Sequence, residues 1–526
     1  MRASTDDSVK LNKDLERYIE RALEEGRPIK IGWGQAGDEK PKEGEFGVIS
    51  HLPEGARVQC LGNLGEYSGS ANLGGTFTLL GNASTMFAAY HSSGRTVVEK
   101  NTGNNTGFRM SGGEVTIQGS VGDSAGAGMT GGTLLVKGHA GPGLGSGMKG
   151  GLVMVMGSVG SNPGLGMSDG RIIVSGSCPP PGEGVSMRAI TKSEIKELSE
   201  KIDPLGMVLT EDALVLEPTN EGESEGNRPE SFISEGFEKI SLVPNEDALH
   251  DHITLDHFTL LVPSNSEAEG LALPIPWIVE KDDPSLWEEG SMQNYPSLVR
   301  SKPRKVDMML VDEGNLLRAT SEIGDSAGLV LDTESFRGFN DAEIEGVLVS
   351  LVSRLEGPAL VLLKGGIVRV ERLFRLVSEL EVDGAIVDCA SPGGTRMPAA
   401  LPKIGLAMKA MKMREMGKFV FLEVDEQPEA KDLLISLASG CNGIVSPASE
   451  NPPESQIENI SLQLAGWMRE IGIDRIERIG RRNLCAKDYD TAAISGLRLN
   501  GYDRPLPMWL ELGSKYADNR AKSRFD

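Results

Sequence analysis

A lysine and a glycine-rich turn in the second half of the chain are the residues best suited to binding an anion. Lys364 closes an apolar run and is followed by two glycines. Its ammonium group could bind a ligand or form an internal ion pair with Asp388 or Glu423, and both interpretations remain open. The turn combines backbone N–H groups with a guanidinium, and both features bind anions. The candidate ligand-binding residues are Lys364, Gly393, Gly394, Thr395 and Arg396.

These candidates follow short β-like runs that alternate with amphipathic helical segments. The β-like runs cover residues 306–312, 327–332, 358–364, 383–388, 418–424 and 442–447. The helical segments between them include 341–356, 369–381 and 428–440. Near-continuous apolar strands that alternate with helices predict a parallel α/β sheet with both faces covered.

Two further apolar runs, 258–263 and 271–279, bring the predicted strands to eight. Eight strands suit a (β/α)8 TIM-like barrel, and a doubly wound open sheet is the alternative. Barrel active sites use the loops after the strands. We therefore expect one mouth to hold Lys364, the 393–396 turn, Asp388, Asp425, Glu426 and Ser446.

Half of the six histidines lie in the segment HDHITLDH (250–257). Imidazole and carboxylate groups are good metal ligands. In an extended segment, however, His250 and His252 share one face while His257 points elsewhere. We predict a polar entrance to a strand here, and no metal site.

The first third of the chain, from residue 56 to 189, repeats with a period of 19 residues. Apolar residues recur two and four positions after a glycine, which is the pattern of a short strand with two inward side chains. The glycine recurs at Gly75, Gly94, Gly113, Gly132, Gly151 and Gly170. Methionine recurs later in the period at Met110, Met129, Met148 and Met167.

A unit of this length cannot bury its own apolar face, so it must stack on its neighbours. The repeat predicts a parallel β-helix of about seven coils, with glycines at sharp turns and close backbone contacts and methionines filling the interior. Glycine is not at every third position, which excludes collagen. A calcium-binding β-roll is disfavoured because Asp123 and Asp169 lie at different phases of the period.

The repeat resembles the GXGXG β-helix domain of glutamate synthase, a module that formylmethanofuran dehydrogenase also contains. The resemblance rests on GAGMTGG (126–132), GSGMKGG (145–151) and GLGMSDG (164–170) and covers roughly 130 residues. It implies a right-handed parallel β-helix that serves as an architectural spacer and docking surface.

A second resemblance, to the FMN-binding barrel of glutamate synthase, spans roughly residues 340 to 490. DGAIVDCASPGGTRMPAALP (383–402) is similar to the stretch that ends in that barrel's Gly-Gly-Thr-Gly turn. Lys364 matches the barrel's strand-end lysine, and 470–485 is similar to its post-barrel segment. The resemblance implies that Lys364 and the Gly393–Arg396 turn would contact FMN.

The sequence also departs from this family. Asp425 and Glu426 stand where the family has the two glycines that bind the flavin phosphate, so carboxylate repulsion should disfavour FMN. The family's methionine- and glycine-rich segment is replaced by VEKDDPSLWEEG (279–290), and its iron–sulfur cysteines are absent. The chain also begins Met1-Arg2, without an amidotransferase cysteine, and its domain order is reversed. These departures exclude a complete synthase.

Composition limits the remaining possibilities. The formal net charge of −23 disfavours nucleic acid and anionic membranes as partners. The five scattered cysteines argue against a disulfide framework. No signal peptide or long apolar run is found, so we expect a cytoplasmic protein.

The predicted organisation has five parts. Residues 1–55 form an N-terminal segment, 56–189 the β-helix, 190–245 a capping helix and acidic linker, 246–510 the barrel and 511–526 a tail. We expect a glutamate synthase-like structural or regulatory subunit with a degenerate barrel and no cofactor, which associates with other synthase-type subunits or with itself. The alternatives are an active flavin oxidoreductase that uses FMN, and a β-helix scaffold of a formylmethanofuran dehydrogenase-like complex.

Overall fold

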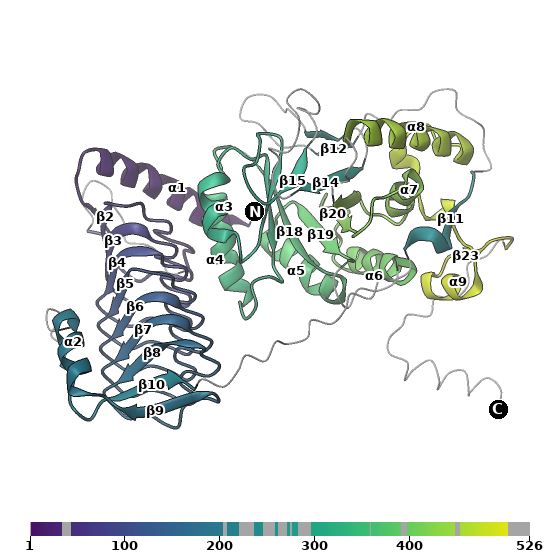
Figure 1. Cartoon of the computed structure of the whole chain (residues 1–526). Coiled ribbons are helices and arrows are strands. Elements are labelled where there is room, and N and C mark those ends of the chain that lie inside the picture. Colours follow the sequence, from purple (N-terminus) through teal and green to yellow (C-terminus); the bar gives the residue numbers. More distant parts are fainter. Residues whose placement is uncertain are drawn as a thin grey trace, which may run out of the picture. The chain divides into compact units, whose positions relative to one another are not determined.

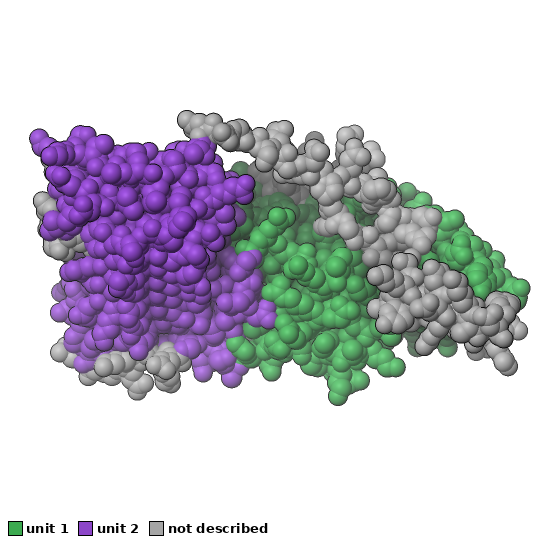
Figure 2. All heavy atoms as spheres, turned by 90° about the horizontal axis from the view of Figure 1, so that it is seen from below, with its two compact units in different colours: residues 1–2, 227–337, 355–526 green, residues 3–226, 338–354 purple. Residues whose placement is uncertain are grey.

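The structure of the chain is a computed structural model. It describes residues 2–33, 44–202, 208–219, 236–245, 258–260, 271–273, 276–281, 296–357, 359–390, 397–447 and 453–502. The chain forms two compact units (Figure 2). One unit comprises residues 1–2, 227–337 and 355–526, and the other comprises residues 3–226 and 338–354.

The second of these units is built on a ten-stranded sheet that runs along a stack of coils (Figure 1). Its first eight strands are parallel and follow the sequence order. They are β1 (Ile29–Ile31), β2 (Arg57–Leu61), β3 (Leu73–Leu80), β4 (Ser93–Val98), β5 (Glu114–Ile117), β6 (Thr130–Val136), β7 (Lys149–Val155) and β8 (Asp169–Val174). Next come β10 (Leu214–Pro218) and β9 (Val185–Ala189), and β10 is antiparallel to both of its neighbours.

The predicted 19-residue register is confirmed by the strand pairing. Val115 pairs with Leu134, and Leu134 pairs with Val153, so partners lie one period apart. The apolar side chains at the two predicted inward positions form one buried cluster with the four recurring methionines. Inward packing of short strands therefore holds the stack together.

The G-x-G motif has a backbone cause that its spacing alone does not reveal. In each of six successive periods, three alternate residues have a positive φ, a conformation that glycine adopts at little cost. Gly126 and Gly128, with φ of 67° and 65°, are examples from one coil. Earlier coils use side-chain-bearing residues at the same phases, such as Tyr67 and Met86. The glycines of the motif therefore relieve backbone strain in the later coils.

A ladder of polar side chains also follows the 19-residue period. In each step a side-chain oxygen or nitrogen accepts a hydrogen bond from the backbone N–H one period later. For example, Asn101 Oδ1 accepts from Ser120 N at 2.8 Å, and His139 Nδ1 accepts from Ser158 N at 3.0 Å. The ladder joins Asn63, Asn82, Asn101, Ser120, His139, Ser158 and Ser177. These bonds satisfy turn amides of successive coils.

Helix α2 (Lys192–Ile202) follows the stack. Its Ile195 and Leu198 pack with the outward-facing Leu135, Met154 and Ile173 of the last parallel strands. The helix is therefore held against the outer face of these strands, while β10 continues the sheet beyond β8.

An ion-pair network joins α2 to β9 and β10. Arg188 contacts Glu194 at 2.7 and 2.9 Å and Glu217 at 2.9 and 3.1 Å. The Arg188 hydrogen bonds are the main cause that lowers the pKa of Glu194 to about 2. Because this pKa lies below the usual value for glutamate, Glu194 stabilises the folded state above about pH 4.5.

We expect this stabilisation to disappear as the pH falls from about 4.5 towards 2. Amide hydrogen exchange of α2 should therefore accelerate at acid pH relative to the amides of β5 and β6. The Glu194→Gln variant should show faster exchange already at neutral pH. Glu197→Gln, which changes an exposed side chain on the same helix, is the matched control and should behave like the parent protein. Equal exchange in both variants would contradict the assigned role of Glu194.

Helices α1 (Ala3–Glu24) and α4 (Asp341–Val352) complete this unit. Thr5 Oγ1 donates to Glu345 at 2.5 Å, and Arg354 forms an ion pair with Glu16. A Cβ on Gly346 would lie 2.6 Å from that of Tyr67, so α4 also closely approaches the stack. In sequence, however, α4 lies between two strands of the other unit.

The other unit contains a closed barrel of eight parallel strands, so the doubly wound alternative is wrong. The strands are β14 (Trp277–Lys281), β15 (Ser297–Val299), β16 (Met308–Val311), β17 (Gly328–Asp332), β18 (Leu360–Gly366), β19 (Gly384–Asp388), β20 (Phe419–Glu423) and β21 (Gly443–Pro447). Side chains such as Ile278, Leu310, Leu362 and Phe421 fill its interior. The barrel is thus a packed core, as in TIM barrels.

Two of the predicted barrel strands require correction. The first, 258–263, contributes β12 (Phe258–Leu260), which among the described strands pairs with β13 (Leu271–Leu273) in an antiparallel sheet outside the barrel. The second, 271–279, contains β13 and the start of β14. The missing barrel strand is β15, whose three residues are too few to show a period in the sequence.

The remaining elements of this unit follow or flank the strands. The α-helices are α3 (Leu316–Glu322), α5 (Val370–Leu380), α6 (Met397–Ala410), α7 (Ala430–Ala438), α8 (Pro453–Ile471) and α9 (Tyr489–Ser495). The short segments include η2 (Phe237–Lys239), β11 (Ile240–Leu242), β22 (Leu484–Ala486) and β23 (Arg498–Leu499). In the described part of the chain, no helix combines the length and the apolar character needed to cross a lipid bilayer.

Candidate functional site

The carboxyl ends of the barrel strands hold a buried ion pair. Lys364 on β18 contacts Glu423, the last residue of β20, with 2.5 Å between Nζ and Oε1. The side chains are only 7% and 12% exposed. Of the two partners considered from the sequence, Asp388 and Glu423, the structure selects Glu423. In the parallel register Asp388 on β19 aligns with Glu423, so three charged residues lie on adjacent strands.

Further carboxylates surround this pair. Burial lowers the pKa of Lys364, but the negative charges of Glu423, Glu280 and Asp388 outweigh this effect, so its pKa is raised and the side chain remains an ammonium. Burial also raises the pKa of Asp332, which ends β17, and the charge of Lys364 opposes that rise. The pair therefore lies in an environment in which negative charge predominates.

Glu423 itself is poised to exchange a proton near neutral pH. Burial raises its pKa to about 7; Lys364 opposes this shift and Asp388 reinforces it. Its Oε2 atom is buried and has no hydrogen-bond partner among the described residues. A buried carboxylate with one such oxygen is costly to ionise fully.

On the opposite part of the strand ring, Arg300 follows β15 and contacts Glu280 on β14 at 3.3 Å. It also forms an ion pair with Asp312, which follows β16. Beside these groups, Trp277 Nε1 donates to the predicted mouth residue Ser446 at 2.8 Å. Ser446 is fully buried, so it positions the tryptophan.

Several of these residues were not identified from the sequence. Asp312 and Asp332 each close an apolar run, and that position was a usable signal for a strand-end carboxylate. Glu280 directly follows the predicted run 271–279 and had the same signal, whereas Arg300 gave none because it follows the unrecognised strand β15. The charged residues around Lys364 come together only because β14 pairs with β21 and closes the barrel.

The remaining sequence candidates divide into two groups. Gly393, Gly394, Thr395 and Arg396, together with His250, His252 and His257, lie outside the described residues. Asp425 and Glu426 are described, are exposed, and line a pocket beside the loop after β20. Their charge therefore acts largely through solvent, and not in the partly dry site expected from the sequence.

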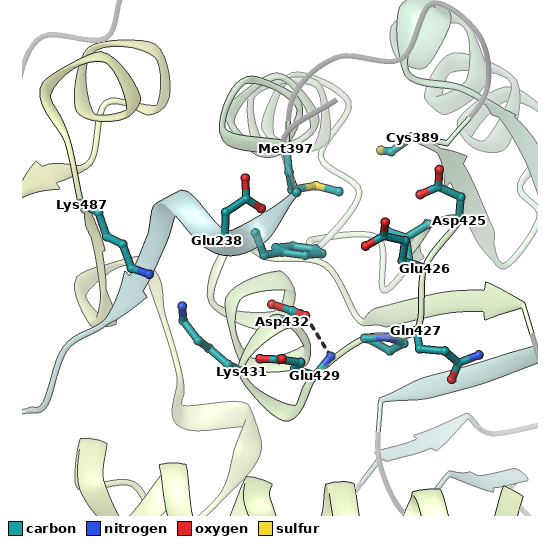
Figure 3. A pocket seen from close by; sticks show the side chains of 14 residues that line it. Glu238, Cys389, Met397, Asp425, Glu426, Gln427, Glu429, Lys431, Asp432 and Lys487 are labelled. Atoms are coloured by element: carbon teal, nitrogen blue, oxygen red, sulfur yellow. Dashed lines mark hydrogen bonds between the residues drawn. The ribbon is translucent and has the colours of Figure 1, made fainter. Parts of the chain in front are cut away.

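The pocket has a volume of about 640 Å³ (Figure 3). Its charged lining residues are Glu238, Asp425, Glu426, Glu429, Asp432, Lys431 and Lys487, and its other lining residues include Phe237, Cys389, Met397 and Pro428. Asp432 Oδ2 accepts a hydrogen bond from Glu429 N at 2.9 Å. Burial is the main cause that raises the pKa of Asp432 to about 6, and Glu429 and Glu238 add to it.

This lining does not fit the phosphate of FMN. A flavin phosphate in a TIM barrel is usually bound by backbone N–H groups of the loops after strands seven and eight. The loop after β20, the seventh strand, instead presents Asp425 and Glu426, and three more carboxylates line the same pocket. Five carboxylates against two lysines disfavour a dianion even after screening by solvent.

All five cysteines are free thiols. Burial raises the pKa of Cys441 to about 12, and burial also raises the pKa of Cys389. Within the described ranges, no group of three or more histidine, cysteine, aspartate and glutamate side chains could hold a metal ion.

No protein-family model and no curated protein matches this sequence. Solved structures with a related chain path include a flavocytochrome b2 variant with sulfite bound, which is 14% identical with a TM-score of 0.36. The match covers 53% of this chain and 84% of that one. A variant of an active chimera of (S)-mandelate dehydrogenase is 15% identical with a TM-score of 0.32, and the match covers 48% of this chain and 89% of that one.

Proposed function

We propose that this chain is a glutamate synthase-related protein in which the barrel does not bind FMN. Its role is that of a structural or regulatory subunit that associates with other synthase-type subunits or with itself. The coil stack is a parallel β-helix of the GXGXG type and provides the docking surface. The 19-residue register and the recurring G-x-G backbone support this part of the proposal.

The observation that carries the proposal is the acidic pocket beside the loop after β20. Asp425 and Glu426 occupy the place where a flavin phosphate needs backbone N–H donors, and Glu238, Glu429 and Asp432 add negative charge. Lys364, the residue that the resemblance assigns to FMN, forms a buried ion pair with Glu423. The ion pair therefore occupies a group that would contact FMN, and the pocket presents negative charge to the FMN phosphate.

An active flavin oxidoreductase is the rival function, and the position of Lys364 near the carboxyl end of β18 favours it. In that case FMN would supply the redox chemistry, and Lys364 would have to leave Glu423 to reach it. A scaffold of a formylmethanofuran dehydrogenase-like complex would need only the β-helix. The closed eight-stranded barrel disfavours that role, because such a scaffold would not need it.

Titration of the purified protein with FMN tests the proposal. We expect no saturable quenching of flavin fluorescence at micromolar FMN, because the pocket repels the phosphate. The double variant Asp425→Gly, Glu426→Gly should recover binding only partly, since three carboxylates remain. Riboflavin, which lacks the phosphate, is the matched ligand control. Saturable binding of FMN, but not of riboflavin, to the parent protein would establish a working phosphate site and overturn the proposal.

A further inference from the structure

The ten-stranded sheet ends at β9, at the far end of the stack from α1 and β2 (Figure 1). Among the described strands, β9 pairs with β10 alone. An edge strand presents alternate backbone groups to which another chain can pair, and proteins protect such edges with very short strands and lysine. The other edge has this protection, because β1 has three residues with Lys30 in the middle. By contrast, β9 has five residues and contains neither lysine nor proline.

Backbone hydrogen bonds at the two ends of β9 determine which of its residues face β10. Gly184 O accepts from Thr219 N, and Ile190 N donates to Ala213 O, both at 2.9 Å. In an antiparallel pair, every second residue exchanges both of its backbone bonds with the neighbouring strand. The even-numbered residues of β9 therefore bond to β10, and the odd-numbered residues direct their N–H and C=O groups to the outer edge. These outward residues are Val185, Met187 and Ala189.

The side chains of the outward residues are apolar and lie on the face of the sheet that covers the core of the stack. Met187 aligns with Leu216, which is fully buried in that core, and Val185 packs against the same core. Met187 is nevertheless 42% exposed, and Ala189 is also exposed. The outer edge of β9 therefore combines outward backbone groups with apolar surface.

A second copy of β9 fits this edge when the two strands run antiparallel about a twofold axis at Met187. Val185 then lies opposite Ala189 of the second copy, and Met187 lies opposite its own counterpart, so each aligned pair exchanges two backbone hydrogen bonds. Ala189 O already accepts a bond of 3.3 Å from Arg188 Nη1, but a carbonyl oxygen has a second lone pair. The edge is thus self-complementary, as an isologous dimer requires.

The charges at the two ends of β9 favour the same arrangement. Glu183 precedes the strand, Lys192 follows it, and both are exposed. Antiparallel pairing brings each glutamate near the lysine of the other copy, whereas parallel pairing would bring like charges together. The ion pair of Lys192 with Glu211, at 3.2 Å, is largely exposed and competes only weakly. Arg188 is neutralised by the glutamates of its own copy, so the two arginines repel each other little.

We propose that this chain forms a homodimer in which β9 pairs antiparallel with β9 of a second copy and joins the two sheets into one. The inference deepens the proposed function and rests on it in one respect, the use of the coil stack as a docking surface. It names a second copy as the partner and β9 as the contacting strand. One strand pair is a small interface, so we expect a reversible dimer with a Kd on the order of 10 μM.

Sedimentation velocity of the full chain over a range of concentrations around this Kd measures the dimer. Met187→Pro removes an outward N–H group without removing a bond to β10, and it should raise the Kd about tenfold or more. Met187→Ala keeps that N–H group and should raise the Kd only about twofold. A proline variant that dimerises as tightly as the parent protein would overturn the inference.

A charge exchange tests the antiparallel direction. Glu183→Lys and Lys192→Glu each place like charges at the ends of the paired strands, so each should raise the Kd about threefold. The double variant again places opposite charges together and should recover the Kd of the parent protein. Failure of the double variant to recover would contradict the proposed pairing.

Amide hydrogen exchange of the parent protein, resolved to single residues, needs no variant. The amides of Met187 and Ala189 should exchange more slowly as the protein concentration rises, whereas those of Ser186 and Arg188, bonded to β10, should be protected at every concentration. A monomer throughout, or exchange of Met187 that does not depend on concentration, would overturn the inference. The FMN titration reports on the barrel, so saturable FMN binding would overturn the proposed function and leave the β9 dimer intact.

Discussion

Replacing Gly132 by valine is expected to lower the free energy of unfolding of the coil stack by roughly 3 to 5 kcal/mol. Gly132 has a φ of 78°, which a β-branched residue adopts only with strain. A Cβ at this position would lie 2.6 Å from Met110 Cε and 2.8 Å from the Gly112 carbonyl carbon. The backbone of the neighbouring coil cannot move away without breaking the strand register. Urea unfolding followed by far-ultraviolet circular dichroism measures the change.

Gly147 provides the matched control for this prediction. Its φ is 65°, but a Cβ there would meet no atom within 4 Å. Gly147→Ala should therefore cost only the backbone strain, about 1 kcal/mol, and Gly132→Ala should fall between the two variants. If Gly132→Val proved no more destabilising than Gly147→Ala, the assigned packing of the coils would be wrong.

Replacing Lys364 by methionine is the second change with a large expected effect. The variant leaves Glu423 buried near Asp388 without its ammonium partner. Breaking a buried ion pair from one side typically costs 3 to 5 kcal/mol, so we expect a loss of about 3 kcal/mol at pH 8. Thermal and urea unfolding at fixed ionic strength measure this loss.

The pH dependence of this variant identifies its cause. Burial raises the pKa of Glu423 to about 7 even with Lys364 present, so without Lys364 it should be higher still. A carboxyl group with a raised pKa destabilises the folded state as the pH rises through that value. The Lys364→Met defect should therefore shrink at pH 5, where Glu423 takes up a proton.

A double variant completes the comparison. Lys364→Met combined with Glu423→Leu removes both charges, and it should be more stable at pH 8 than Lys364→Met alone. A pH-independent defect in Lys364→Met, with no recovery in the double variant, would show that packing of the lysine chain and not its charge stabilises the barrel.

The repeat was the most predictable part of the fold, because its side chains are set by a period that the sequence repeats six times. Leu134 and Val136 could be assigned to the interior from their spacing alone, and they are fully buried. The positive φ of Gly126 and Gly128 could not be predicted from the sequence, because it depends on the backbone hydrogen bonds that each coil forms with the coil before it and the coil after it.

The barrel was less predictable for a physical reason. Strands such as β19 are fully apolar until a final aspartate, and this pattern is clear in the sequence. By contrast, β15 is only three residues long and makes sense as a strand only between β14 and β16. Closure of the barrel then brings Glu280 close enough for its charge to act on Lys364, although the two residues are far apart in sequence.

The visible absorbance spectrum of the protein purified from its native source tests the central claim most directly. The account predicts a colourless protein that shows no flavin band and releases no flavin on heat denaturation, because the carboxylates around the loop after β20 disfavour the FMN phosphate. Stoichiometric flavin in that preparation would contradict the account and would favour an oxidoreductase in which Lys364 exchanges Glu423 for the cofactor.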